Sequence, residues 1–388
     1  MVSLLLSLVR HGDERGYTRM LEAFWDEARD FGLELPQERP VTAQAFSQAR
    51  GKLPSAVVRG LLHRAADEFD ARHGDELRWH GRRLLAVDGA RRFVQCSDEL
   101  RHAYGRPDGA HYPMVHVTTL FDVTSQLPLD AVVGRYGADE RAQLLLVLDR
   151  AREGDVLVLD RGYPSFDALS VLALRGLDFV VRVPASWTFK AVEEFLATGR
   201  REGEIALVPP PGSPMTDMEP LRVRIVVVSR RGDEPWVLLT SLATAEFTAA
   251  DVADAYTRRW RIEEYYKLLV GAYFGQGFFH ARTVRGVEQE ILAQMLFVAI
   301  ARLLAAAAAR LADVPYERVS QKAIILATAD HLTRLVLHRS TDRAHDHLTR
   351  LFERLARAVE KPRRSRSYPR RSLLPARKWG PAGRHSGA

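Results

Sequence analysis

Two short apolar segments that each run directly into an aspartate constrain the fold of this chain most strongly. Residues 84–87 lead into Asp88 and residues 156–159 lead into Asp160, and a glycine follows each aspartate within two positions. Apolar runs of this length, bounded by turn-forming residues, are typical of buried strands. A single aspartate at such a place is often only a turn former. Two of them, on strands that can be neighbours, predict a shared acidic site, because a buried carboxylate needs compensation.

The segments around these two predict an α/β fold. Strands are expected at 84–88, 115–121, 129–134, 155–160 and 179–183, and helices at 139–152 and 164–175, the latter with Pro164 in its first turn. Further strand patterns at 204–208, 221–228 and 236–240 indicate a small β insertion. After residue 251 the chain is expected to be helical to about residue 360.

The first 78 residues are expected to be helical, at 1–10, 14–32, 43–50 and 54–72, with Thr42 capping the third helix. The first helix is apolar but has neither a basic leader nor a small-residue cleavage site, so we expect it to pack rather than act as a signal peptide. The other three either form a DNA-reading bundle or a plain helical cap.

The amino-acid composition mainly indicates the cellular compartment in which the protein is found. The single cysteine, Cys96, excludes a disulfide within the chain and argues against a cysteine-based zinc site, which suits a reducing cytosol. The apolar run 291–309 is interrupted by Gln294 and Arg302, so we expect a buried helix rather than a membrane span. A cytoplasmic protein without a membrane segment is predicted.

The segment from Tyr256 to Glu263 carries a polar stripe. At about 100° per residue, the side chains of Tyr256, Arg259 and Glu263 fall on one side of a helix that begins here, whereas Trp260 and Ile262 point elsewhere and can pack. An Arg–Glu pair at this spacing is also common on exposed helices. Three carboxylates from two strands and one helix would make an all-oxygen site of the kind that Mg²⁺ or Mn²⁺ prefers. Such a site suits metal-assisted phosphodiester chemistry, and the lack of a Gly-rich phosphate loop argues against ATP use.

These segments resemble DDE transposases of the bacterial insertion-sequence-four group. The resemblance rests on Val87-Asp88-Gly89, on Leu159-Asp160-Arg161-Gly162-Tyr163 and on Tyr256-x-x-Arg259-x-x-x-Glu263. The long spacer before the glutamate, residues 279–290 and a basic tail agree with it, and it covers roughly residues 40–380. It implies an α/β fold with a ribonuclease-H-like mixed sheet, an inserted β subdomain and flanking helices.

The resemblance also implies roles for the matching residues. Asp88, Asp160 and Glu263 would be the catalytic triad and would bind Mg²⁺ or Mn²⁺. Tyr256 and Arg259 would contact DNA phosphates near the cleaved end.

Other positions near these motifs allow two interpretations. The family motif ends with a lysine where this chain has Val270, and Lys267, on the same helical face, is the expected replacement. Arg161 either contacts DNA or pairs with Asp160. Trp236 and Trp260 are either stacking residues for a flipped base or, as is more common for tryptophan, core residues. Arg282 and Arg285 either contact a DNA phosphate or are merely surface residues at the start of a helix.

The C-terminal tail is strongly basic. It holds nine Lys or Arg and no Asp or Glu from residue 361 onward, whereas the whole chain has a net charge of +7, so the rest is close to neutral. Its poverty in apolar residues and its prolines argue against independent folding. A solvated end is one interpretation; a phosphate-binding arm is favoured, through Arg363, Arg364, Arg366, Arg370 and Arg371.

The expected division of the chain follows from these patterns. It comprises an N-terminal helical region (1–78), a first catalytic part (79–184), the β insertion (185–250), a second catalytic part with the third acid (251–310), C-terminal helices (311–360) and the tail (361–388). The resemblance implies a DNA transposase that acts on double-stranded DNA, both terminal inverted repeats and target, as a homodimer on DNA near the bacterial nucleoid. A DNA-binding remnant without activity and a ribonuclease-H-like nuclease are the alternatives.

Overall fold

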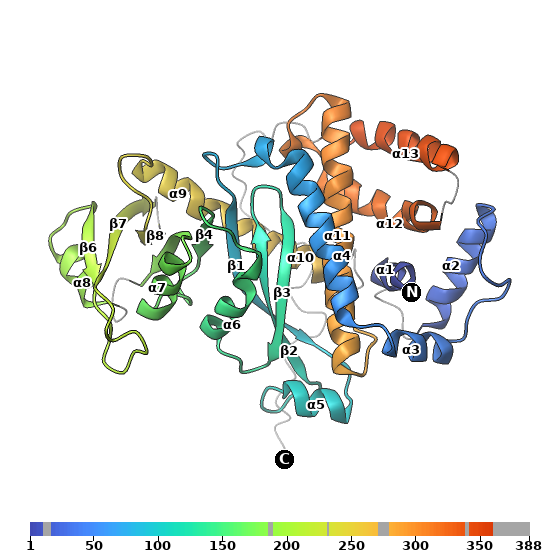
Figure 1. Cartoon of the computed structure of the whole chain (residues 1–388), viewed down its shortest axis with the longest axis horizontal. Coiled ribbons are helices and arrows are strands. Elements are labelled where there is room, and N and C mark those ends of the chain that lie inside the picture. The colour runs from blue at the N-terminus through green and yellow to red at the C-terminus, as the bar shows by residue number, and fades with distance from the viewer. Residues whose placement is uncertain (11–16, 185–188, 231–232, 271–278, 338–340, 360–388) are drawn as a thin grey trace, which may run out of the picture.

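The centre of the protein is one mixed sheet of eight strands. The computed structural model describes residues 1–10, 17–184, 189–230, 233–270, 279–337 and 341–359. The strands lie in the order β3-β2-β1-β4-β5-β8-β7-β6 (Figure 1). They are β1 (Leu84–Phe93), β2 (Met114–Asp122), β3 (Leu127–Arg135), β4 (Val156–Leu159), β5 (Asp178–Val183), β6 (Glu202–Leu207), β7 (Leu221–Arg230) and β8 (Asp233–Thr240).

Strand directions confirm the predicted fold class. β1, β2 and β3 form antiparallel pairs, whereas β4 lies parallel to β1 and β5 lies parallel to β4. Each parallel pair is joined through a helical crossover, as parallel pairing requires: α6 (Glu140–Val147) precedes β4 and α7 (Phe166–Leu174) precedes β5. Three antiparallel strands followed by two parallel ones in this order are the ribonuclease-H-like arrangement.

The inserted strands extend this sheet instead of forming a separate one. β8 pairs antiparallel with β5, β7 with β8, and β6 with β7. A helix that the sequence patterns did not reveal, α8 (Lys190–Ala197), packs on β6 through Val192 and Phe195. The insertion therefore lengthens the sheet at its β5 edge, at the left in Figure 1.

The helix α11 (Val284–Ala312) organises the other half of the molecule. It packs against β3 and against helices from both ends of the chain (Figure 1). Among described helices it alone is long and apolar enough to cross a membrane, but 83% of its most apolar window is buried within the protein. The predicted buried helix at 291–309 is therefore confirmed. The other helices on this side are α1 (Val2–Arg10), α2 (Thr18–Asp30), α3 (Ala43–Gly51), α4 (Ser55–His73), α12 (Gln321–Leu337) and α13 (Thr341–Ala356).

Helix starts follow capping side chains. The hydroxyl of Thr42 accepts a hydrogen bond from the Ala45 N–H at 3.1 Å, as predicted. Ser165 caps α7 in the same way by accepting from Ala168. The helix consequently begins at Phe166, and the prediction that Pro164 lies in its first turn is wrong.

The predicted end of the first strand at Asp88 is also wrong. β1 continues to Phe93, because residues 88–93 remain paired with β2. Its parallel pairing with β4, however, stops at Ala86. Asp88 therefore lies in mid-strand but just beyond the point where β4 leaves the sheet, which brings it near Asp160 at the end of β4.

Candidate active site

The polar stripe spans the junction of two helices, α9 (Ala249–Arg258) and α10 (Trp260–Val270). α9 starts at a capping box in which Thr248 and Asp251 each accept a hydrogen bond from the other's backbone N–H. The prediction that a helix begins at Tyr256 is therefore wrong. Arg259, between the helices, keeps helical dihedrals (φ −50°, ψ −34°), so the spacing of the stripe survives the junction.

Arg259 holds the stripe together. Its Nη2 donates a 2.8 Å hydrogen bond to Glu263 Oε1, and its Cζ lies 5.8 Å from the centroid of the Tyr256 ring. Burial alone would lower the pKa of Arg259, but the side chains of Tyr256, Glu263, Asp88 and Asp160 together raise it above its usual value. The guanidinium is therefore a permanent positive charge among the three predicted carboxylates.

Asp88 is the most perturbed of these carboxyl groups. Burial raises the pKa of Asp88 to about 7, and the charges of Asp160 and Glu263 add to the increase, whereas Arg259 opposes it. Because Asp160 and Glu263 both act on Asp88, the structure brings the three predicted acids into one electrostatic neighbourhood.

Asp160 is fixed by the turn that follows β4. Its Oδ1 accepts a 2.8 Å hydrogen bond from the Gly162 N–H. Arg161 is exposed, and it forms no ion pair with Asp160 or with any other described residue. The interpretation of Arg161 as the partner of Asp160 is therefore wrong.

The described residues contain no group of three or more His, Cys, Asp or Glu side chains gathered to hold one metal ion. The reason lies in the partners of the acids: Glu263 is directed to Arg259, and Asp160 to the Gly162 N–H. Like charges repel at short distance. The three acids share one neighbourhood without converging on one point.

A fourth carboxylate, which the sequence analysis missed, lies beside this group. A side chain on Gly162 would place its Cβ 3.1 Å from Asp160 Oδ1 and 3.6 Å from Glu140 Oε2, so both acids flank this glycine. Glu140 begins α6, and its Oε1 lies 3.6 Å from Nε2 of the fully buried His116. The predicted helix at 139–152 is confirmed in its first part, with Asp139 as the cap, but nothing in the sequence indicated that Glu140 lies beside Asp160.

His116 also explains the glycine after Asp88. A Cβ at Gly89 would lie 2.2 Å from His116 Nε2, which no side chain tolerates. Neither ring nitrogen of His116 has a hydrogen-bond partner among described residues. Burial lowers the pKa of His116, and the Glu140 charge opposes that effect.

Two tyrosines lie close to Asp88. Tyr266 donates a 2.6 Å hydrogen bond from its hydroxyl to the backbone oxygen of Asp88. Tyr163 is fully buried, and its hydroxyl has no hydrogen-bond partner among described residues. Burial raises the pKa of Tyr163, and the charges of Asp88, Glu140 and Asp160 add to the increase. Burial also raises the pKa of Tyr266, so both phenols stay protonated and neutral.

The two tryptophans differ in their surroundings. Trp236, on β8, is half-buried and packs edge-on against Tyr256, with ring centroids 4.8 Å apart. Trp260 is 53% exposed, so the prediction that it packs into the core is wrong, whereas Ile262 is fully buried as predicted. The exposed Lys267 places its Nζ 5.1 Å from the centroid of the Trp260 ring. An exposed aromatic ring and a cation thus lie next to the stripe.

Some predicted contacts lie outside the described residues. These are the tail arginines Arg363, Arg364, Arg366, Arg370 and Arg371. The side chain of Val270 is likewise not described, although α10 extends to that residue. The tail interpretation therefore stays a prediction.

Sequence comparisons bear on this site directly. A family profile described as "Transposase DDE domain" matches residues 74–300, which include all three acids. "Transposase InsG for insertion sequence element IS4" from Escherichia coli (strain K12) is 27% identical over 247 residues, 61% of this chain and 54% of that protein. "Putative transposase InsZ" from the same organism is 27% identical over 146 residues, 36% of this chain and 49% of that protein. The chain spans about half the length of these relatives.

Among solved structures, the chain is similar to a piggyBac transposase in a synaptic complex with hairpin DNA. The TM-score is 0.44 and the identity 9%, over 89% of this chain and 82% of that one. A likeness at this level carries no argument about fold or function.

Proposed function

This chain belongs to the family of proteins with a transposase DDE domain, and from that membership we propose that it is a DNA transposase. It would cleave transposon ends and join them to target DNA through Asp88, Asp160 and Glu263. The observation that carries the proposal is the placement of the three acids. Asp88 lies on β1, and Asp160 directly follows the neighbouring strand β4. Glu263 is hydrogen-bonded to Arg259, whose charge acts on both aspartates. Buried carboxyl groups with charged neighbours are typical of functional sites.

The chemistry of this neighbourhood fits a divalent metal ion. Every acidic donor is a carboxylate oxygen, which Mg²⁺ and Mn²⁺ prefer. Burial is the main reason that the pKa of Asp88 is raised, and the charges of Asp160 and Glu263 add to it; a bound cation would favour the ionised carboxylate. Asp88, Asp160 and Glu263 would hold the ion, which when bound supplies Lewis acidity for phosphodiester cleavage.

The protein's own groups would position the DNA. Arg259 is suited to clamp a phosphate, because a guanidinium offers several N–H donors in a fixed plane and only one donates to Glu263. The neutral hydroxyl of Tyr256 lies beside it. Arg161, exposed at the turn after β4, and Lys267 on α10 would contact the DNA backbone farther out.

Partners, assembly and domain division remain part of the proposal. The substrates would be double-stranded DNA at the element's inverted repeats and at the target. A homodimer would form on DNA, since two ends must be held together. The domain boundaries stay as expected from the sequence, and the protein would act in the cytoplasm at the bacterial nucleoid.

A cleavage assay with the element's own terminal repeats tests the proposal. In Mg²⁺ or Mn²⁺, we expect nicking at the ends and joined products. Tight binding without cleavage would instead indicate an inactive DNA-binding remnant. Nicking without end specificity or joining would indicate a ribonuclease-H-like nuclease.

Replacing Lys267 with alanine should weaken binding of the DNA end. If Lys267 contacts one phosphate, the dependence of log affinity on log salt should fall by about one, and cleavage should decrease with binding. Fluorescence anisotropy across a salt series measures this slope. Lys190→Ala on α8, another exposed helical lysine, paired with Glu194, is the matched control. Unchanged affinity and cleavage in Lys267→Ala would refute the contact.

Deleting residues 361–388 should make the affinity of the chain for DNA ends depend less steeply on salt concentration. If six or more tail charges meet phosphates, affinity should fall by roughly 10³–10⁵ between about 50 and 200 mM salt in the intact chain. The truncated chain should lose much of that slope. An identical slope in both chains would mean that the tail is only a solvated end.

A further inference from the structure

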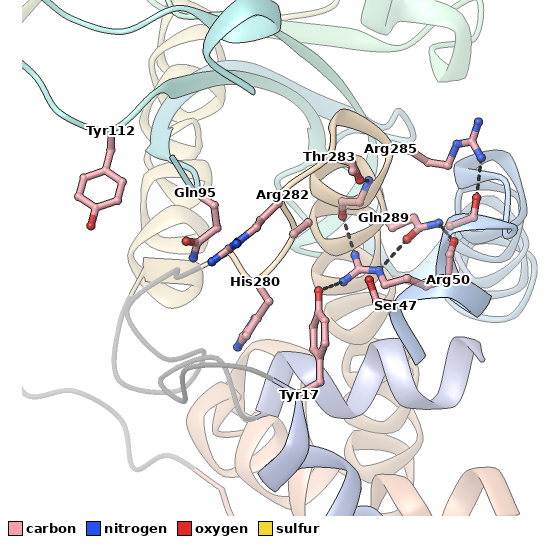
Figure 2. A pocket seen from close by; sticks show the side chains of 13 residues that line it. Tyr17, Ser47, Arg50, Gln95, Tyr112, His280, Arg282, Thr283, Arg285 and Gln289 are labelled. Carbon is pink, nitrogen blue, oxygen red and sulfur yellow. Dashed lines mark hydrogen bonds between the residues drawn. The ribbon is translucent and has the colours of Figure 1, made fainter. Parts of the chain in front are cut away.

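A pocket of about 560 Å³ lies between α3, the segment after β1 and the start of α11. We call it the α3–α11 pocket, and its polar lining includes Tyr17, Ser47, Arg50, Gln95, Arg282 and Arg285 (Figure 2). None of the residues proposed for catalysis lines it. Its walls come from segments more than 200 positions apart in the sequence, so no sequence pattern could reveal it.

The charge of the pocket is one-sided. Three arginines line it, and the described lining residues include no Asp or Glu. The charge of Arg50 is matched by Glu290 behind the wall, at 2.8 Å. Arg282 and Arg285 are exposed and lie in no ion pair among described residues. Among described residues, two guanidinium groups at this pocket therefore face no carboxylate, which suits an anionic ligand.

Behind Arg282 and Arg285, hydrogen bonds already join α3 to α11. Arg50 Nη2 donates to the Gly286 oxygen at 2.8 Å, and Gln289 Nε2 donates to the backbone oxygens of Arg50 and Leu53 at 2.9 and 2.7 Å. Arg285 Nη1 reaches across to the Gly51 oxygen at 2.7 Å, which leaves its other donors available (Figure 2). Because α3 is already tied to α11, binding would require little ordering.

The start of α11 contributes only a minor part. Thr283 caps the helix, and the helix dipole adds positive potential at this end. However, the Val284 N–H already donates to Glu99 Oε1 at 2.8 Å. The two arginines and the cavity, rather than the helix end, therefore define the site.

We propose that the α3–α11 pocket binds backbone phosphates of the DNA end, inward from the cleaved bond. This proposal rests on the proposed transposase function. Gln95, which lines the pocket, follows Asp88 by seven residues and so lies at most about 23 Å from it at about 3.3 Å per residue, a span of about seven base pairs at about 3.4 Å each. A duplex with its end at Asp88 and its axis along β1 would place phosphates about seven base pairs inward at Arg282 and Arg285.

The test compares salt dependence in the full chain. For Arg282→Ala/Arg285→Ala, the slope of log affinity against log salt should fall by about 1.8, because about 0.9 is lost per phosphate contact. The matched control, Arg175→Ala/Arg354→Ala, removes two other exposed arginines and should leave the slope unchanged. In wild type, phosphate ethylation about seven base pairs from the cleaved bond should interfere with binding, and this interference should disappear in the double variant.

A second pair of variants avoids disturbing the wall. Ser47 is exposed on α3 and lines the pocket, so Ser47→Glu should weaken end binding at least about fivefold relative to Ser47→Gln through repulsion of phosphate. Equal affinities, together with an unchanged slope in the arginine variant, would overturn the proposal. In a further outcome, inorganic phosphate raises the melting temperature of wild type but not of the arginine variant, while both proteins show the same slope of log DNA affinity against log salt. That result would mean that the pocket binds a free anion, and it would refute the DNA contact. A wild-type chain that binds no DNA ends would overturn the proposed function itself.

Discussion

Replacing Asp160 with asparagine should reduce cleavage of DNA ends at least about a thousandfold, because an anionic ligand lost from a metal site removes several kcal/mol of transition-state stabilisation. The substitution keeps the shape of the side chain, and its amide oxygen can still accept the Gly162 N–H bond that fixes the turn. The fold should therefore survive. Single-turnover cleavage of labelled ends in Mg²⁺ measures the effect.

The affinity of Asp160→Asn for DNA ends should not fall with its cleavage activity. Removing one negative charge beside Asp88 relieves repulsion of the DNA backbone, so end affinity should be equal or higher in Asp160→Asn. Asp149→Asn, which removes the same charge from an exposed position, is the control and should leave cleavage intact. Cleavage by Asp160→Asn at the wild-type rate would refute the assignment of the triad.

Replacing Arg50 with methionine should lower the free energy of unfolding by about 3–5 kcal/mol, because it removes the arginine partner of the buried carboxylate of Glu290 and leaves it, among described residues, only the contacts with His280. Arg50 and Glu290 have only 4% and 5% of their side chains exposed, and Nη1 of Arg50 donates to Glu290 Oε1 at 2.8 Å. The same guanidinium donates to Tyr17, Gln289 and the Gly286 oxygen. Urea denaturation measures the loss.

A surface pair serves as the comparison. Arg72→Met breaks the exposed ion pair with Glu68 and should cost less than about 1 kcal/mol. Adding Glu290→Gln to Arg50→Met should recover part of the stability, because the unpaired charge disappears. A loss below about 1 kcal/mol for Arg50→Met would mean that the carboxylate of Glu290 is satisfied without the arginine.

In this chain the sequence predicts the presence of strands and helices better than the residues at which they begin or end. The strands around Asp88 and Asp160 and the apolar helix at 291–309 follow from apolar runs and from the residues that bound or interrupt them. The end of β1 was missed because its continuation depends on pairing with β2, a tertiary interaction. The start of α9 was available in the sequence as the capping box Thr248-x-x-Asp251, which begins eight residues before Tyr256, the first residue of the stripe.

The candidate active site, too, could be predicted from the sequence only in part. The spacing of Tyr256, Arg259 and Glu263 was sufficient to place them on one side of a helix. Glu140 and His116 were not predictable, because only the sheet and the α6 crossover bring them near Asp160. The exposure of Trp260 was missed because tryptophan is usually buried, and composition cannot reveal an aromatic ring left open to solvent.

The central position of α11 has a consequence for biosynthesis. α1 and α4 pack on this helix, yet it is encoded roughly 200 residues after α4, so at about 5–20 residues per second the ribosome needs about 10–40 s to supply it. Until then α4 can pack on β3 and α1 on α2, but the faces of both helices that pack on α11 stay uncovered. The nascent chain therefore passes through a period in which these faces are open to solvent or to transient contacts, and the pocket between α3 and α11 can form only after that period ends.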